Sequence, residues 1–209
     1  MKSHSRIFCQ NTRSAQTELF ATPIVPGLTC TQELITLAEE RALIERLAEL
    51  PMAPFRFHGW TGKRLTASFG WRYDFEDASF RLAAPIPDFL LALRDKAAAF
   101  AGVPADALVQ ALAVRYDPGA GIGWHRDRPV FEHVVGISLG AHATLRFRRR
   151  RGTGFDRASL WLEPRSAYHL SGEARHHWEH SIMEMAVRRW SITLRSLSAK
   201  GRAVTGDRN

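Results

Sequence analysis

The sequence predicts a mainly β fold with flanking helices, an antiparallel sandwich or jelly roll in which two N-terminal helices pack on one sheet. Short segments in which apolar residues alternate with polar ones recur along the chain, and Gly and Pro separate them. Two segments in the first half instead repeat apolar residues at helical spacing. Since no helical pattern separates the later strands, an antiparallel arrangement is favoured over a parallel sheet.

Both predicted helices have start and stop signals. The first spans residues 31–50, with Thr31 as a possible N-cap and Pro51 as its stop. The second spans residues 87–100 and ends before Gly102. We expect their apolar faces to cover one sheet from the outside.

The predicted strands lie between and after these helices. Residues 69–75 place an aromatic side chain at every second position, so one face of that strand is aromatic and the other is polar. The remaining predicted strands are residues 109–116, 134–139, 144–148, 159–162, 167–170, 177–182 and 190–197.

One domain is expected from the 209 residues, with residues 21–197 folded and residues 1–20 and 198–209 loosely ordered. No apolar run is long enough to cross a bilayer, so no membrane partner is expected, and the protein is expected to be a monomer. The basic N-terminus lacks the apolar stretch of an export signal, which favours a cytoplasmic protein. The two cysteines, Cys9 and Cys30, are expected to be free thiols.

The positive charge of the chain favours a polyanionic partner. Lys and Arg outnumber Asp and Glu by 29 to 21, which gives a formal net charge of +8. A nucleic acid, DNA or RNA, is therefore the expected partner, although a generic basic surface explains the charge equally well. The basic stretch at residues 146–151 is either an edge that contacts phosphates or a solvated hairpin tip.

A metal-binding motif follows the predicted strand at residues 109–116. A Gly-rich turn leads into His125-Arg126-Asp127, and residues i and i+2 of an extended chain point to the same side. A second imidazole would complete the two-His, one-carboxylate face that holds Fe(II) and leaves positions open for a co-substrate and oxygen. Alone the motif is weak, because surface pairs of this kind often occur by chance.

The second imidazole is expected from residues 171–182, which contain His176, His177 and His180. As residues of one strand, His176 and His180 would share a face, so periodicity does not choose between them. On the residues alone the third ligand stays open.

Three motifs together resemble the AlkB family of 2-oxoglutarate oxygenases, and the likeness spans roughly residues 20–197. The motifs are His-x-Asp at residues 125–127, Gly-Glu-x-Arg…His-Ser-Ile within residues 172–182, and Arg-Trp-Ser-Ile-Thr-Leu-Arg at residues 189–195. The resemblance implies a double-stranded β-helix that binds Fe(II) and uses 2-oxoglutarate and O2 as co-substrates. In that family the second histidine precedes a small residue and an Ile, which implies His180 as the ligand beside His125 and Asp127.

The resemblance also implies a co-substrate pocket formed by Tyr116, Arg189, Ser191 and Arg195. The two arginines lie on one face of the last predicted strand, about 20 Å apart, opposite its apolar face. Arg189 would pair with the distal carboxylate of 2-oxoglutarate, helped by the Tyr116 hydroxyl, while Arg195 braces the metal end. The alternative is a solvated strand face. Val114 stands where the family usually has Asn.

The aromatic strand, with basic residues between positions 56 and 64 before it, resembles the lid that AlkB-like enzymes place over their substrate. The expected substrate contacts are therefore Trp60, Trp71, Tyr73 and Arg128. Stacking on aromatic rings and Arg–phosphate contacts would suit a nucleotide. A plain core strand is the alternative.

The implied reaction oxidises a substrate C–H bond, and on an N-methyl group it ends in demethylation, so repair of alkylated DNA or RNA is the leading expectation. Demethylating members commonly have further acids after the ligand Asp, whereas Arg128 and Pro129 follow Asp127 here. Residues 127–139 are more similar to the branch that hydroxylates modified wobble uridines in tRNA. A protein substrate and a non-catalytic nucleic-acid-binding jelly roll are further alternatives, although a complete triad of charged ligands without a cation would be costly.

Overall fold

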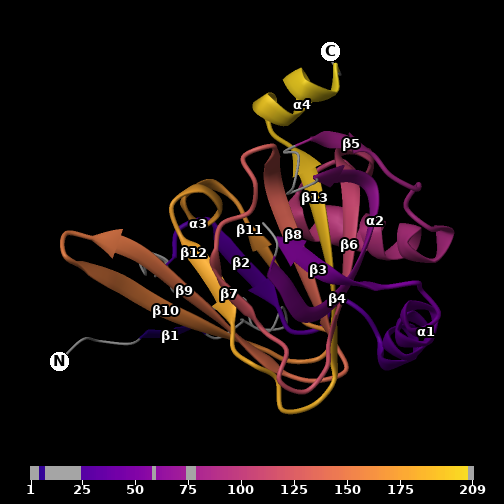
Figure 1. Cartoon of the computed structure of the whole chain (residues 1–209), viewed down its shortest axis with the longest axis horizontal. Helices are drawn as coiled ribbons and strands as arrows, with labels where there is room; N and C mark the ends of the chain where they lie inside the picture. The colour runs from indigo at the N-terminus through magenta and orange to yellow at the C-terminus, as the bar shows by residue number, and fades with distance from the viewer. Residues whose placement is uncertain (1–4, 8–24, 58–59, 74–78, 207–209) are drawn as a thin grey trace, which may run out of the picture.

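The computed structural model describes residues 5–7, 25–57, 60–73 and 79–206, which form two sheets with the two longer helices on one side (Figure 1). Strands that neighbour each other are antiparallel, except that β1 runs parallel to β10. In order across the smaller sheet, the strands are β1 (Ser5–Ile7), β10 (Gly154–Leu162), β9 (Ala143–Arg151), β12 (Glu179–Ile182) and β7 (Ile122–His125). In order across the larger sheet, they are β2 (Leu28–Thr31), β11 (Ala167–Leu170), β8 (Phe131–Leu139), β13 (Arg189–Leu197), β6 (Leu108–Tyr116), β4 (Trp60–Tyr73) and β3 (Ala53–Phe57), with β5 (Phe80–Leu82) paired to β4.

Apolar side chains from both sheets meet in a core between them. Phe147 of β9, Leu160 of β10 and Val114 of β6 belong to one buried cluster. Because side chains alternate along a strand, the opposite face of the larger sheet is free to pack against helices. The predicted mainly β, jelly-roll arrangement is confirmed.

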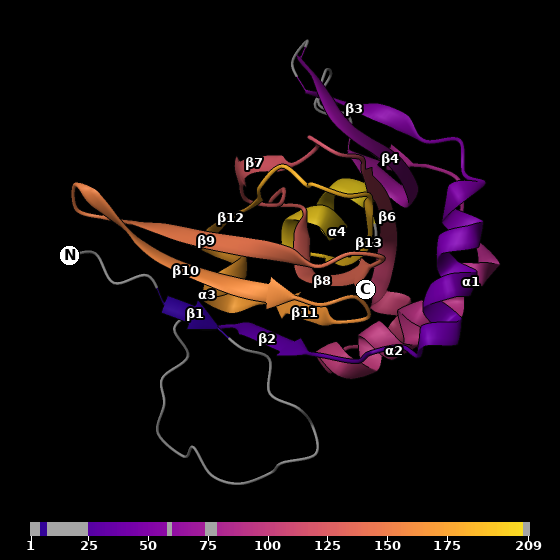
Figure 2. The same ribbon diagram turned by 90° about the horizontal axis from the view of Figure 1, so that it is seen from below.

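Helices α1 (Leu37–Ala48) and α2 (Leu91–Ala101) cover the outer face of the larger sheet (Figure 2). Leu47 of α1 packs in a second buried cluster with Ile137 of β8. Helix α2 ends at Gly102, whose φ of 67° lies in the left-handed region that glycine adopts readily. The prediction that two helices cover one sheet from outside is confirmed.

Helix α1 begins later than predicted. Its N-cap is Thr36, whose hydroxyl accepts a hydrogen bond from the Glu39 backbone N–H at 3.2 Å. The Glu39 carboxylate accepts one in return from the Thr36 N–H at 2.8 Å. This reciprocal cap fixes the helix start, whereas Thr31 is the last residue of β2.

Several short elements were not predicted. The strands β2, β3, β5 and β7 are short or irregular, so their alternation is weak. The predicted strand at residues 177–182 begins only at Glu179, because the residues before it form helix α3. The additional short helices are η1 (Asp88–Leu90), η2 (Ala105–Ala107), α3 (Gly172–His176) and α4 (Ala199–Thr205).

Helix α4 lies where the sequence indicates a loosely ordered tail, so that expectation is wrong for residues 199–205. The hydroxyl of Ser198 accepts a hydrogen bond from the Gly201 N–H and donates one to the Pro129 carbonyl. A Cβ at Gly201 would lie 2.1 Å from the Val130 carbonyl oxygen, so glycine permits this close approach. Through these contacts, Ser198 and helix α4 pack against residues 129–130, in the segment that follows β7.

The N-terminal region also departs from its expectation. Cys30 of β2 is disulfide-bonded, so the prediction of free thiols is wrong, since composition does not show which sulfurs a fold brings together. Residues 5–7 pair with β10, and the rest of the expected loose segment at residues 1–20 lies outside the described residues. Within the described ranges, no helix has the length and apolar character needed to span a membrane.

Candidate metal centre and co-substrate pocket

A cavity of about 1340 Å³ opens between the two sheets. Side chains from β6, β8 and β13 of the larger sheet line it, together with side chains from β7, β9 and β12 of the smaller one. The lining combines apolar side chains with polar ones, and on β13 every lining residue is polar or charged. These polar groups indicate the chemistry of the cavity.

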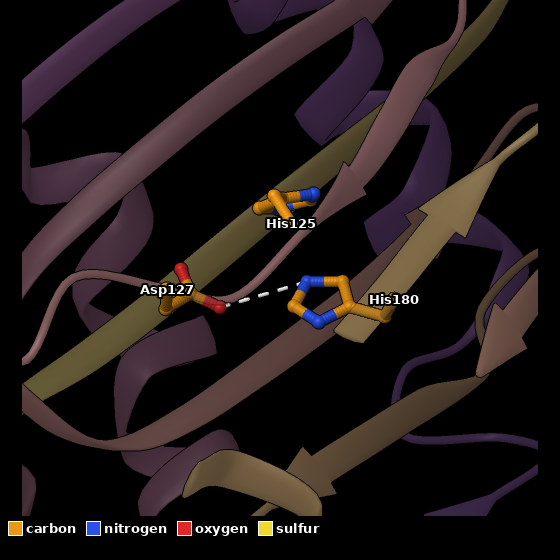
Figure 3. Close-up of side chains that lie close together, drawn as sticks. All are labelled: His125, Asp127 and His180. Carbon is orange, nitrogen blue, oxygen red and sulfur yellow. Dashed lines mark ion pairs between the residues drawn. The ribbon is translucent and has the colours of Figure 1, made fainter. Parts of the chain in front are cut away.

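His125 and His180 lie directly opposite each other on the antiparallel strands β7 and β12. Their ring centroids are 4.2 Å apart. Asp127 points to the same place, with its Oδ2 3.6 Å from Nε2 of His180 (Figure 3). The candidate ligand atoms of these three residues all lie within 4.8 Å of one another, a spacing that one metal ion can bridge.

The pairing of β7 with β12 depends on Gly121 in the turn before β7. A Cβ at this position would lie 2.9 Å from the carbonyl oxygen of Ile182, at the end of β12. Because glycine lacks this atom, the turn approaches closely enough for the two histidine-bearing strands to pair.

The two histidines are held in the neutral form that binds metals. Nδ1 of His125 lies 2.9 Å from the Gly123 carbonyl oxygen. A carbonyl only accepts, so Nδ1 donates its hydrogen and Nε2 keeps a free lone pair. Burial lowers the pKa of His125, and burial together with the neighbouring His125 lowers the pKa of His180 to about 3.

Asp127 is held as a carboxylate by Arg195. Nε and Nη2 of Arg195 each lie 2.8 Å from Oδ1 of Asp127, and Nη1 donates to Gln110 at 2.9 Å. Burial raises the pKa of the Asp127 carboxyl, but the positive charge of Arg195 and its neighbours outweighs burial, so the pKa lies well below its ordinary value. Arg195 thus engages one carboxylate oxygen and leaves the other facing the histidines.

His176 and His177 lie outside this cluster. Nε2 of His176 is 3.0 Å from a Glu132 oxygen at the exposed rim, and His177 is exposed. Because His176 belongs to α3, the strand face that it was expected to share with His180 does not exist, and that interpretation is wrong. The structure places His180, the histidine that the family motif implies, beside His125 and Asp127.

Arg189 lies at the other end of the same face of β13, with only 1% of its surface exposed. Its Nε and Nη2 donate to the Ser138 hydroxyl at 3.3 and 3.1 Å, while Nη1 is a buried nitrogen that finds no hydrogen-bond partner among the described residues. The Tyr116 ring lies 5.3 Å from its guanidinium carbon. A buried cation with an unpaired N–H beside a cavity fits one end of a dicarboxylate.

Ser191 lies between the two arginines on the cavity face of β13 and pairs across the sheet with Val114 of β6. Trp190, Ile192 and Leu194 point the other way, into the core beneath the helices. This alternation matches the pattern predicted for the strand. Since the Val114 side chain makes no hydrogen bonds, the side-chain partner of Arg189 is Ser138 of β8.

The expected substrate contacts are only partly brought to the cavity. Arg128 lines it. Trp71 stacks on Phe80, with ring centroids 5.0 Å apart, and does not line the cavity, because the neighbouring Arg72 occupies the inward position of β4. Trp60 and Tyr73 lie at the ends of β4, and their side chains are outside the described residues.

Sequence reasoning missed three polar residues that line or support the cavity. Gln110 and Ser138 occupy inward positions of β6 and β8, a signal that the alternating pattern contains. Arg175 of α3 donates to the carbonyls of Arg128 and Phe131 and so holds the segment after Asp127. Arg64 of β4, one of the basic residues expected in the lid before the aromatic strand, is nearly buried against the cavity.

The arginine run lies on β9 and at its hairpin with β10. Arg148 pairs with Glu179 at 2.6 Å and Arg149 with Asp156 at 3.2 Å. Arg151 near the tip has 79% of its side chain exposed and lies 3.4 Å from Asp156. The run therefore combines ion-paired arginines along the strand with a more exposed, also paired, arginine at the tip.

Comparison with known proteins decides the family. The family described as the 2OG-Fe(II) oxygenase superfamily matches residues 28–197, which include the triad and both cavity arginines. The chain belongs to this superfamily. This oxygenase uses Fe(II) and 2-oxoglutarate, and the His125, Asp127 and His180 cluster is its candidate iron site.

The oxygenase is similar in sequence to two ALKBH8 proteins and in fold to an ALKBH1 structure. The "tRNA (carboxymethyluridine(34)-5-O)-methyltransferase ALKBH8" of Macaca fascicularis is 26% identical over 196 residues, covering 91% of this chain and 29% of the relative. The Mus musculus protein of the same name is 26% identical and covers 87% of this chain and 27% of the relative. The oxygenase thus spans less than a third of the length of these relatives. The structure of OsALKBH1 aligns with a TM-score of 0.62 at 15% identity, covering 82% of this chain and 98% of that chain, and shares its fold.

Proposed function

We propose that this oxygenase oxidises a modified base in a nucleic acid, and that removal of an N-alkyl group, the chemistry of DNA or RNA alkylation repair, is its leading reaction. The supporting observation is the concentration of arginines around the cavity that holds the triad. Besides Arg189 and Arg195, the lining includes Arg64, Arg72, Arg126, Arg128 and Arg175. This positive charge exceeds what one co-substrate needs and suits a phosphate backbone.

Different residues of the cavity would bind the metal and the co-substrate. Fe(II), 2-oxoglutarate and O2 together supply the oxidation of a substrate C–H bond and release succinate and CO2. His125 and His180 present neutral imidazoles, and Asp127 presents the carboxylate oxygen that Arg195 leaves free. Arg189 takes the distal carboxylate of 2-oxoglutarate. A base hydroxylated on an N-methyl carbon then loses formaldehyde.

Hydroxylation of a modified tRNA nucleoside is the second candidate. The ALKBH8 relatives carry a tRNA uridine in their name. In addition, Arg128 and Pro129 follow Asp127, where demethylating AlkB-like enzymes commonly have acids. A non-catalytic binding module is disfavoured, because the buried charges of the triad and of Arg189 are costly without a metal and a co-substrate.

The test is a substrate panel with the iron-loaded enzyme, 2-oxoglutarate and ascorbate. The panel contains methylated DNA and RNA oligonucleotides, bulk tRNA and a basic peptide mixture, each followed by mass spectrometry and by succinate release. We expect loss of a methyl group or gain of one oxygen on a nucleic acid, and neither in the Asp127→Ala variant. Oxidation confined to the peptides would contradict the proposal.

A further inference from the structure

Arg64 is a largely buried cation that has no acidic partner among the residues that the structure describes. It lies on β4, is 8% exposed and lines the cavity. Its guanidinium carbon lies 3.9 Å from the centre of the Phe55 ring. Within the described part of the chain it makes no hydrogen bond or ion pair, whereas Arg195, Arg189 and Arg175 each donate to an oxygen.

A largely buried guanidinium without an acidic partner is costly, and a ligand with oxygen acceptors would complete it. Burial lowers the pKa of Arg64, yet a guanidinium stays charged in proteins. The guanidinium carbon lies over the Phe55 ring, and a guanidinium presents its N–H donors as a planar fork, as the recognition of a base edge or a carboxylate requires.

Arg64 belongs to a different strand from the two arginines of the co-substrate pocket. Arg189 and Arg195 project from β13, whereas Arg64 projects from β4, two strands away across β6. The positive charge of Arg64 acts on His125, and Arg64 is itself within electrostatic reach of Tyr116 and Arg195. Arg64 therefore lies near the metal cluster, on a strand that carries neither of the other two arginines.

The carboxylates of the cavity do not offer a place for a cationic base. Among the described residues that line it, the carboxylates are Asp127 and Glu179. Asp127 is engaged by Arg195 and Glu179 by Arg148. A positively charged methylated base would thus meet Arg64 without a compensating acid, while oxygen acceptors would meet a free donor.

We propose that Arg64 is a specificity-determining residue that donates hydrogen bonds to acceptor oxygens of the substrate base and disfavours cationic bases. This inference rests on the proposed oxidation of a modified base, and within it favours neutral N-alkylated bases and modified uridines over cationic bases. The acceptors are either the carbonyl edge of a pyrimidine or a carboxylate substituent on the base, and both present in-plane oxygens to the same fork.

The experiment compares three single-stranded RNA oligonucleotides that differ at one base: uridine, 5-carboxymethyluridine or 1-methyladenine. Binding to the enzyme loaded with Fe(II) and 2-oxoglutarate without oxygen is measured by fluorescence anisotropy. We expect at least one uridine oligonucleotide to bind about tenfold more tightly than the 1-methyladenine oligonucleotide, as a charge-assisted hydrogen bond implies. Tighter binding of 5-carboxymethyluridine than of uridine would identify the carboxylate substituent as the acceptor of the Arg64 hydrogen bonds. Equal affinities for the two uridine oligonucleotides would identify the carbonyl edge of the base as the acceptor.

Arg64→Gln removes the charge and the fork, and we expect it to abolish the preference. Lys63→Gln removes one charge from the exposed face of the same strand, where Lys63 pairs with Glu184, and we expect it to keep the wild-type ratio. Arg64→Lys keeps the charge but not the fork, so it retains part of any preference for a carboxylate and loses the preference for a carbonyl edge. If Arg64→Gln does not fold, the Arg64→Lys variant alone still tests the inference.

Two results would overturn the inference but leave the proposed function standing. One is binding without a preference, or a preference that survives both Arg64 variants. The other is a fall in 2-oxoglutarate affinity on Arg64→Gln as large as that on Arg189→Lys, because Arg64 would then belong to the co-substrate pocket. If none of the oligonucleotides binds the wild-type enzyme, the inference and the proposed function both fail.

Discussion

Arg195 donates a hydrogen bond from Nε to Oδ1 of Asp127, and its Nη2 lies 2.8 Å from the same oxygen in an ion pair. Asp127 lies beyond the end of a strand, in a segment that is not held by sheet hydrogen bonds, so this contact sets the direction in which its free oxygen points. Orientation of a ligand by a second residue of this kind commonly changes metal affinity strongly.

We therefore expect Arg195→Lys to weaken Fe(II) binding by about tenfold or more, since one ammonium group does not replace two N–H groups on Asp127 and a third on Gln110. Anaerobic titration with Fe(II) measures the effect. Arg115→Lys is the control, because Arg115 pairs with Asp117 away from the cavity. Equal Fe(II) affinity in both variants would show that Arg195 does not support metal binding.

Loss of His180 should abolish Fe(II) binding, whereas loss of His176 should not, because only the first of these histidines faces His125 and Asp127. Single replacements by Ala, titrated anaerobically with Fe(II), separate the two. Retention of the metal by His180→Ala together with its loss from His176→Ala would reverse the assignment.

Arg189→Lys should weaken 2-oxoglutarate binding by about tenfold to a hundredfold, since the free Nη1 and its neighbour present a fork that an ammonium group lacks. Arg188→Lys, one residue earlier and exposed beside Asp117, is the matched control. Calorimetric titration of the metal-loaded protein gives both affinities. A wild-type affinity in Arg189→Lys would return Arg189 to a purely structural role.

The arginine run on β9 should contribute to nucleic-acid binding through phosphate contacts. Replacing Arg148, Arg149 and Arg150 with Ser should make the dependence of log affinity on log salt shallower, by about 0.7 per lost contact with a single strand. Oligonucleotide binding across a salt series measures the slope. Replacing Arg41 and Arg46 of α1 should leave it unchanged, and an unchanged slope in the triple variant would contradict the prediction.

His169 should make stability depend on pH. It is 6% exposed, and burial together with the neighbouring His133 lowers its pKa to about 4, from an ordinary value of 6.5. Between these two values the unfolded chain binds more protons, so the free energy of unfolding falls as the pH decreases through this window. We expect His169→Gln to reduce this fall by on the order of 1 to 2 kcal/mol.

Urea denaturation at about pH 7, 6 and 5 tests this expectation. His142→Gln is the control, because His142 is exposed and stacks on Trp161 at the surface. Parallel pH profiles for the wild type and His169→Gln would show that the protonation of His169 is not linked to folding.

The sequence could predict those parts of the site that local geometry determines. His125 and Asp127 are two residues apart, and Arg189 and Arg195 share a strand phase, so alternation alone places each pair on one side. Alternation could not distinguish His180 from His176. The five-residue helix α3 contains His176, so His176 does not lie on the strand face that it was assumed to share with His180. Only the family motif selected the correct histidine.

The role of Arg64 could not be predicted for a different reason. Arg64 has no hydrogen-bond or ion-pair partner among the residues that the structure describes, and a missing contact can be recognised only in the packed cavity. Trp71 shows the opposite case, in which a conspicuous aromatic residue packs on Phe80 instead of lining the cavity. On β4, the alternation of the strand determines which side chains line the cavity, and the type of residue does not predict this.

Because His125 and His180 lie opposite each other on two paired strands, a metal ion bound by both would also affect the stability of the fold. An ion bound by both histidines would join the two strands and close a loop that contains all of β8, β9, β10 and β11. Because binding to the folded state alone adds to stability, the metal would stabilise the smaller sheet as well as supply the chemistry.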